Sequence, residues 1–262
     1  METVSVDKEK EIGIFDTPIT LGTHLEFNAK DYQEEFIDSC LEHPRVLGVW
    51  TRQGGKTTSM GLFMVWECLL IPNLKYGVIT PMQEHYLEFF AKVKELIDRS
   101  EIVKQHIVRC TAELIVWDNG SSIKFLATGP YGTVIRGKTF DRIVLDETQN
   151  HKAEIVRRAI IPTGATRPNL KIFLLGTGYA QTGFFFDSYK SGKYKVHQYD
   201  WSYAVRSGLI TQAYIDEQRD DCTDYEFACE YGAQFVDFSD CYFEFELLES
   251  CIDEGYSMVR ID

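Results

Sequence analysis

The fold is decided by one stretch of the chain, which reads Val46-Leu47-Gly48-Val49-Trp50-Thr51-Arg52-Gln53-Gly54-Gly55-Lys56-Thr57-Thr58. An apolar run leads into a short polar, glycine-rich turn and then into a segment compatible with a helix as far as Leu70. This layout is typical of a phosphate-binding loop between a buried strand and a helix. The glycines allow backbone N–H groups to face an anion, and the start of the helix adds the positive end of its dipole.

The match to the general phosphate-loop pattern is incomplete at one position. The pattern G-x-x-x-x-G-K-[ST] requires glycine at position 50, where this chain has Trp50. Taken alone, the segment 54–57 would be read as an ordinary strand, turn and helix with a surface lysine. A second motif further along the chain favours the phosphate-binding interpretation, in which Lys56 reaches the β- and γ-phosphates and Thr57 offers a hydroxyl to Mg²⁺.

That second motif is a pair of adjacent carboxylates, Asp146 and Glu147, which follows a predicted buried strand at 142–145. Ligands of open α/β sheets sit beyond the carboxyl ends of the strands, so we expect these acids at the same edge as Lys56. There Asp146 can hold Mg²⁺ opposite Thr57, and Glu147 can accept a proton from a water aligned behind the γ-phosphate. The alternative is a solvated acidic strand end, which the apolar run and the upstream loop disfavour.

Three further residues are candidates at this edge. A predicted strand at 170–175 runs into Gly176-Thr177-Gly178, which either brings Thr177 to the site or forms a simple turn. A guanidinium near the γ-phosphate can be worth ~10³–10⁵ in rate. Arg52 lies inside the loop and could act in cis, whereas Arg136, on a glycine-flanked loop, could act in cis or on a neighbouring subunit. The alternative for both is a surface arginine.

A predicted amphipathic helix at 28–41 carries Tyr32-Gln33. Composition alone favours an ordinary half-buried tyrosine beside a solvated glutamine. The sharper interpretation is an adenine contact, in which the ring packs on the base and the amide bonds to its edge.

Strands and helices alternate along most of the chain. Besides the strands already named, the pattern predicts a strand at 76–80 and helices at 56–70, 84–97 and 155–161, and Asn119-Gly120 between two apolar runs predicts a β-hairpin. Alternating strands and helices favour an α/β fold with a mainly parallel sheet.

We expect a core domain at 1–194, a small helical lid or linker subdomain at 195–250 with helices at 211–219 and 224–231, and a tail at 251–262.

Composition narrows the class of protein. The chain has 262 residues, of which 44% are hydrophobic. It has no apolar run of membrane-spanning length, and its charged N-terminus lacks the apolar stretch expected of a signal peptide. Seven cysteines lie scattered without paired spacing, which favours reduced intracellular thiols. The net charge of −13 argues against broad coating of nucleic acid but permits a local basic patch.

From about residue 28 the chain resembles the ATPase part of the large terminase subunit, the DNA-packaging motor of tailed bacteriophages and related viruses. Phosphate loops of that family often lack the first glycine and have Arg-Gln before the Gly-Lys-Thr core. This fits Trp50 and the segment Thr51-Arg52-Gln53-Gly54-Gly55-Lys56-Thr57 that follows it. The other matching segments are Tyr32-Gln33 as the adenine motif, Ile135-Arg136-Gly137 as the arginine loop, Ile143-Val144-Leu145-Asp146-Glu147 as the Walker B strand, Leu174-Leu175-Gly176-Thr177-Gly178 with Phe184-Phe185-Phe186-Asp187 as the coupling motif and the segment after it, and Glu230-Tyr231 to Phe243 as the stretch leading to the next domain.

The resemblance implies a P-loop NTPase fold of the RecA-like (ASCE) type that uses ATP and Mg²⁺. It implies ATP hydrolysis that moves double-stranded DNA into a procapsid. Its implied partners are double-stranded DNA, the portal protein, the small terminase subunit and further copies of the chain in a ring, with five expected. Its implied location is the host cytoplasm, docked transiently at the portal vertex.

Large terminase subunits usually carry a C-terminal nuclease, and the chain stops at Asp262, where that domain would begin. We therefore expect no DNA cleavage from this polypeptide. Two other functions stay open. One is a helicase-like or other DNA-remodelling ATPase, which shares Thr80-Pro81 and the Gln33 motif but needs a second motor domain. The other is a nucleotide-binding switch or scaffold without turnover, which would have no need of a base at Glu147.

Overall fold

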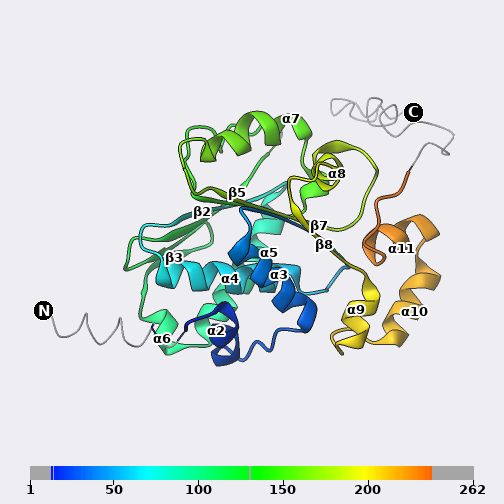
Figure 1. Ribbon diagram of the computed structural model, residues 1–262, viewed down its shortest axis with the longest axis horizontal. Coiled ribbons are helices and arrows are strands. Elements are labelled where there is room, and N and C mark those ends of the chain that lie inside the picture. Colours follow the sequence, from blue (N-terminus) through cyan, green and yellow to red (C-terminus); the bar gives the residue numbers. More distant parts are fainter. Residues whose placement is uncertain (1–12, 14, 130, 238–262) are drawn as a thin grey trace, which may run out of the picture.

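An eight-stranded sheet forms the centre of the protein, with strand order β3-β4-β5-β2-β6-β7-β1-β8 (Figure 1). The computed structural model describes residues 13, 15–129 and 131–237. Strands from β5 to β8 pair in parallel, and β3 and β4 form an antiparallel extension at one edge. The strands are β1 Arg45–Trp50, β2 Lys75–Thr80, β3 Ile107–Thr111, β4 Leu114–Trp117, β5 Ser122–Ala127, β6 Arg142–Leu145, β7 Lys171–Gly176 and β8 Lys195–Tyr199. The predicted α/β class, the mainly parallel sheet and the hairpin are therefore confirmed.

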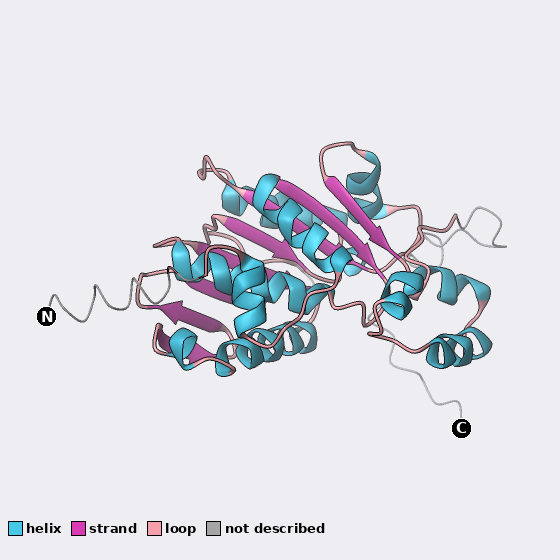
Figure 2. Ribbon diagram, turned by 60° about the horizontal axis from the view of Figure 1, so that its bottom comes forward, coloured by secondary structure: helices cyan, strands magenta, loops and turns pink. Residues whose placement is uncertain are grey.

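Helices cover both faces of the sheet (Figure 2). One face packs against α2 Pro18–His24, α3 Asp31–Glu42, α4 Lys56–Leu70, α5 Gln83–Asp98 and α6 Glu101–Lys104. The other packs against α7 Ala153–Ile155, its continuations η2 Val156–Ile160 and η3 Ile161–Gly164, and α8 Gly183–Lys190. Neighbouring side chains of β1 enter opposite cores, Val46 on the first face and Leu47 on the second, because side chains alternate along a strand. Each helical layer therefore has its own apolar core.

Helix α4, which follows the loop after β1, is the most extensively buried helix of the first layer. In α4 the consecutive residues Leu62, Phe63, Met64 and Val65 all have 0% exposure, so the helix is apolar around most of its circumference. A helix of this kind needs neighbours on several sides, and α4 contacts α2, α3 and α5. The start of α4, and with it Lys56, is thereby fixed firmly against the sheet.

Trp50 occupies the position of the missing glycine because that position belongs to the strand and not to the loop. Its side chain is fully buried and packs at ring-centroid distances of 5.2 Å on Phe36 and 5.0 Å on Tyr199. Gly48 makes room for the indole, since a Cβ there would lie 2.7 Å from Trp50 Nε1. The loop proper therefore begins at Thr51, and the departure from the general pattern has a structural cause.

The sheet continues past residue 194, where the sequence predicted that the core domain would end. Strand β8 pairs in parallel with β1 along Val46–Trp50, so the first residues of the predicted 195–250 subdomain belong to the sheet. The local sequence does not predict β8, because its residues Lys195-Val196-His197-Gln198-Tyr199 are largely polar. The division of the chain into domains stays a prediction, with the helical part beginning after Tyr199.

Three short helices follow β8 and form a small cluster beside the carboxyl ends of the strands, at the right of Figure 1. They are α9 Trp201–Arg206, α10 Gln212–Asp221 and α11 Asp224–Glu230. The cluster has a core of its own, formed by Ala204, Ile210, Ile215, Phe227 and Tyr231. The two helices predicted at 211–219 and 224–231 are thus present. The predicted tail 251–262 and the stretch 238–250, which includes the end of the segment from Glu230 to Phe243, lie outside the described residues. Across the described ranges, every helix is too short or too polar to span a bilayer.

Candidate nucleotide site

The loop after β1 and the acids after β6 meet at one rim of the sheet. The ammonium of Lys56 lies 2.7 Å from Glu147 Oε1, to which it donates a hydrogen bond, and 3.8 Å from Asp146 Oδ1. All three side chains are largely buried, with exposures of 13% for Lys56, 7% for Asp146 and 25% for Glu147. The predicted meeting of these side chains is therefore confirmed, while their chemical roles stay predictions.

Burial and charge set the ionisation of this triad. Burial raises the pKa of Asp146 to about 6, and the nearby Lys56 charge only partly opposes this effect. The pKa of Glu147 is lowered, because the charge and hydrogen bond of Lys56 outweigh the opposite effect of burial. The pKa of Lys56 is raised, because the two carboxylates outweigh the burial that would lower it. At neutral pH the ammonium therefore stays charged and neutralises one of two carboxylates.

A cavity of about 680 Å³ opens over the loop, a volume typical of small-molecule sites. Its walls come from the segment before α3, from the loop, from α5 and from the turn after α9. It is lined by the predicted ATP-binding residues Gln33, Thr51, Gln53, Gly54, Gly55, Lys56, Thr57 and Thr58, together with Glu26, Phe27, Asn28, Lys30, Lys92, Arg99 and Leu209. Two predicted ATP-binding residues, Tyr32 and Arg52, do not line it.

Tyr32 and Gln33 hold the backbone of the loop. The Tyr32 hydroxyl and the Gln33 amide both donate to the carbonyl of Gly54, at 2.8 and 3.1 Å. Gly55 has φ +86°, and a Cβ there would lie 2.3 Å from Gln33 Nε2, so only glycine fits. The Tyr32 ring is 6% exposed and packs on Trp50, Tyr199 and Tyr203. The Tyr32 ring thus packs on protein side chains and does not line the cavity, and the contact of Gln33 with a base stays a prediction.

Arg52 points to the helical cluster instead of the cavity. Its Nε and Nη2 donate to the two carboxylate oxygens of Glu230 at 2.6 and 3.3 Å, and its backbone N–H donates to the Glu230 carbonyl at 2.8 Å. Arg136 lies on the exposed surface of the loop between β5 and β6, which is anchored by the fully buried Ile135. Neither arginine lines the cavity in this conformation.

The predicted coupling segment is connected to Glu147 through Gln149. The Gln149 amide donates to Glu147 Oε2 at 2.7 Å and to the Thr177 hydroxyl at 3.2 Å. Gly176 ends β7, and the Gly178 backbone N–H donates to the Cys229 carbonyl of α11 at 3.0 Å. Glu147 itself has φ +50°, a left-handed conformation that is rare for glutamate and is frequent at functional sites. Thr177 therefore lies at the site rather than in an isolated turn.

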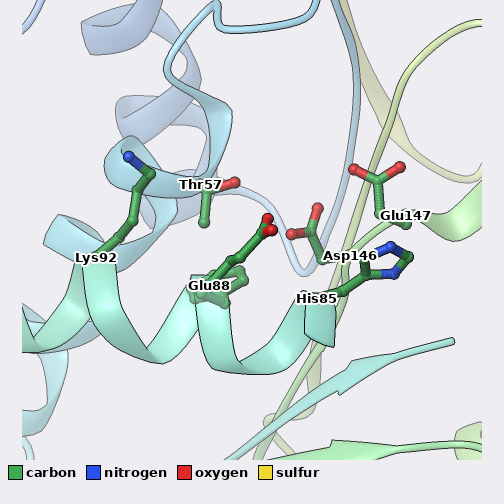
Figure 3. Close-up of a pocket in the computed structure, with 7 residues that line it drawn as sticks. Thr57, His85, Glu88, Lys92, Asp146 and Glu147 are labelled. Atoms are coloured by element: carbon green, nitrogen blue, oxygen red, sulfur yellow. The ribbon is translucent and has the colours of Figure 1, made fainter. Parts of the chain in front are cut away.

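A smaller cavity of about 80 Å³ adjoins the triad on the side of α5 (Figure 3). It is lined by Thr57, His85, Glu88, Phe89, Lys92, Asp146 and Glu147. Asp146 Oδ1 is buried there and has no hydrogen-bond partner among the described residues. Hydroxyl and carboxylate oxygens are the ligands that Mg²⁺ prefers, usually one or two carboxylates with waters and substrate phosphates. Thr57 and Asp146 thus fit a Mg²⁺ ion, although no group of three or more His, Cys, Asp or Glu in the described ranges forms a complete site by itself.

The fold matches solved structures of phage large terminases. The ATPase domain of the large terminase of Thermus phage P74-26 superposes with a TM-score of 0.69, covering 82% of this chain and 97% of that one at 19% identity. The large terminase of bacteriophage HK97 gives 0.65 over 79% of this chain and 50% of that one, at 14% identity. The chain has the fold of a large terminase ATPase domain. No family model and no curated protein matches the sequence.

Some structures with this terminase fold hold nucleotides. The large terminase of a thermophilic bacteriophage, solved in complex with ADP, gives a TM-score of 0.65 over 79% of this chain and 54% of that one, at 8% identity. The same terminase in complex with ATP-γ-S gives 0.62 over 79% and 52%, at 11% identity. The fold is therefore one in which adenine nucleotides are bound.

Sequence reasoning gave no site role to five residues that the structure brings to this rim: His85, Glu88, Lys92, Gln149 and Glu230. Gln149 was within reach, because it follows the Asp-Glu pair by only two positions. The others come from helices whose sequence pattern signals burial and not chemistry. Only the packing of α5 and α11 against the strand ends brings them to the site.

Proposed function

We propose that the protein is a Mg²⁺-dependent ATPase whose substrate occupies the cavity over the loop after β1. The observation that carries this proposal is the placement of Lys56 between Glu147 and Asp146, at 2.7 and 3.8 Å. A passive nucleotide binder has no need of a carboxylate held beside the phosphate-binding lysine. The identities with terminase structures are below 25%, so the activity rests on this geometry and not on the likeness.

Each residue of the triad has one task in the proposed hydrolysis. The backbone N–H groups around Gly55 and the start of α4 bind the phosphates. The Lys56 ammonium then exchanges its ion pair with Glu147 for one with the phosphates. Glu147, released from the ammonium, then accepts a proton from the attacking water. Thr57 and Asp146 would hold Mg²⁺, which neutralises charge on the β- and γ-phosphates when bound. Lys56 holds Glu147 in an ion pair, so a phosphate that competes for the ammonium would free the base.

Two substitutions test the hydrolysis. Glu147→Gln should retain ATP-γ-S binding while turnover falls by ~10²–10⁴, the usual contribution of a positioned base. Lys56→Ala should weaken nucleotide binding itself. Equal turnover in Glu147→Gln and the parent protein would refute the assignment of Glu147 as the base, whereas nucleotide binding without any turnover in the parent protein would favour a switch or scaffold.

We further propose that hydrolysis moves double-stranded DNA in a ring of copies that docks at a procapsid portal, with the small terminase subunit as a second partner. The terminase ATPase fold supports this proposal over a helicase-like function. In such a ring the exposed Arg136 would reach the substrate of a neighbouring copy. Specific activity should then rise with protein concentration, whereas directional unwinding of a forked duplex would support the helicase alternative.

A mixing experiment separates action in trans from action in cis. Arg136→Ala has an intact triad, and Glu147→Gln has an intact Arg136, so a mixture should regain activity that neither variant has alone. Lys152→Ala, which removes another exposed cation, serves as the control and should behave like the parent chain. A mixture that stays inactive, with activity independent of concentration, would place the arginine function in cis.

A further inference from the structure

One face of helix α5 forms a wall of the 80 Å³ cavity beside Asp146. His85, Glu88 and Lys92 are spaced three and four residues apart, which places them on one side of the helix. All three line the 80 Å³ cavity together with Thr57, Asp146 and Glu147. In Figure 3 the Glu88 carboxylate points towards Thr57 and Asp146, and the His85 ring lies beside Asp146. The cavity is therefore built by α5 as much as by the phosphate loop.

The charges around this cavity favour a cation. Three carboxylates line it, from Glu88, Asp146 and Glu147, and the Lys56 ammonium already bonds to one of them. Within the described residues, Asp146 Oδ1 and His85 Nδ1 are buried atoms without a hydrogen-bond partner. Buried polar atoms are normally bonded, so two such atoms at one small cavity mark a place for a hydrated ligand. The fully buried Phe89 closes the cavity on the side of the core.

Lys92 occupies a distinctive position, because it lines both this cavity and the larger nucleotide cavity. Thr57 is the other residue besides Lys92 that the two linings have in common, and it is the predicted metal-binding hydroxyl. The junction of the two cavities is therefore where the phosphates and a metal ion bound to them would lie. A lysine at this junction adds a second positive charge to that of Lys56, which also lines the larger cavity.

We propose that Glu88 and His85 of α5 hold the water molecules of the Mg²⁺ ion that Thr57 and Asp146 bind, and that Lys92 contacts the phosphates from the same helix. The inference rests on the proposed function and adds a second helix to its metal site. Mg²⁺ keeps several of its waters in proteins, and those waters donate hydrogen bonds to nearby carboxylates and ring nitrogens. Such outer partners typically contribute 10- to 100-fold to metal affinity, by order of magnitude.

The test measures metal binding directly, with Mn²⁺ as the probe and electron paramagnetic resonance as the readout, in the presence of saturating ADP. Glu88→Gln should weaken Mn²⁺ binding about tenfold, while ADP binding without metal stays unchanged. Glu84→Gln is the matched control, since Glu84 is exposed on the first turn of α5 and does not line the cavity. Asp146→Asn should lose nearly all Mn²⁺ binding.

The outcomes distinguish this inference from the function on which it rests. If Glu88→Gln binds Mn²⁺ as well as Glu84→Gln does, while Asp146→Asn loses it, the role of α5 is refuted and the proposed ATPase stands. If the parent protein with ADP binds no Mn²⁺, the proposed metal site itself is wrong. A tenfold loss in Glu88→Gln with a normal unfolding midpoint supports the inference.

Discussion

The carboxylate of Glu230, at the end of α11, accepts two hydrogen bonds from the guanidinium of Arg52, at 2.6 and 3.3 Å. The same two residues are joined through their backbones, Arg52 N–H to Glu230 carbonyl, at 2.8 Å. The loop after β1 and the helical cluster are thus connected by three hydrogen bonds between these two residues. In the proposed ATPase, Arg52 would contact a phosphate only after the side-chain part of this connection opens.

The first prediction follows from the cost of opening that pair. Glu230→Gln removes the charge that holds Arg52, so ATP-γ-S should bind about 1.5- to 5-fold more tightly, as expected from the 0.2–1 kcal/mol typical of an exposed ion pair. ADP, which lacks the γ-phosphate, should bind as before. Calorimetric titration of both nucleotides measures the difference, with Glu217→Gln on α10 as an exposed control. Unchanged ATP-γ-S affinity would mean that Arg52 serves only to hold the cluster.

A second prediction concerns Gln149, which bonds to both Glu147 and Thr177. Gln149→Ala leaves the base free to rotate, so turnover should fall by on the order of tenfold, a part of the ~10²–10⁴ that a positioned base supplies. Nucleotide binding should be unaffected, because Gln149 does not line the nucleotide cavity. Steady-state kinetics with Asn150→Ala as the neighbouring exposed control decides the matter. A rise in KM without a fall in kcat would contradict the positioning role.

These relationships show what sequence reasoning could reach. The strand-loop-helix at 46–70 and the acidic end of β6 were predictable, because their chemistry follows directly from local patterns. Their meeting at one rim followed from a general property of parallel sheets. By contrast, the pairing of Arg52 with Glu230 joins residues 178 positions apart, and no local pattern specifies it.

Two features of the structure differ from what the sequence predicts, and both differences have the same physical origin. Strand β8 was missed because its position beside β1, and not its own polar sequence, makes it a strand. Tyr32 was assigned a contact with the base, whereas the aromatic residues Trp50, Tyr199 and Tyr203 surround its ring. In both cases tertiary packing decided what composition left open.

A third prediction concerns the acid sensitivity of the fold through His197 on β8. Its Nδ1 contacts the Tyr199 hydroxyl at 2.7 Å, that hydroxyl donates to Glu35 at 3.1 Å, and the buried Nε2 has no partner among the described residues. Burial lowers the pKa of His197 to about 4, against the attraction of the Glu35 carboxylate, and Lys195 and His43 lower it further. Protonation would place a charged N–H where nothing accepts it.

The sign of the pH effect follows from where each state takes up the proton. In the unfolded chain His197 titrates near its ordinary pKa of about 6.5. Between pH 6.5 and 4 the unfolded chain therefore binds more protons than the folded one, and the free energy of unfolding decreases as the pH is lowered. At pH 4.5 this group alone should cost about 2–3 kcal/mol. Urea unfolding at pH 7.5 and 4.5 should therefore show a smaller loss in His197→Gln than in the parent chain. An equal loss in both proteins would exclude His197 as a source of acid sensitivity.

The last prediction tests whether position 50 belongs to the strand or to the loop. Trp50→Gly restores the glycine of the general phosphate-loop pattern but removes an indole that is fully buried. The free energy of unfolding should fall by at least about 3–5 kcal/mol. Gly48→Ala, which places a Cβ 2.7 Å from Trp50 Nε1, should cost about 1–3 kcal/mol through overpacking. Val108→Gly, at a residue that is 64% exposed on β3, is the control and should cost roughly 1 kcal/mol. If Trp50→Gly instead kept its stability and bound ADP more tightly, position 50 would act as part of the loop, and the burial of its side chain would not explain the departure from the pattern.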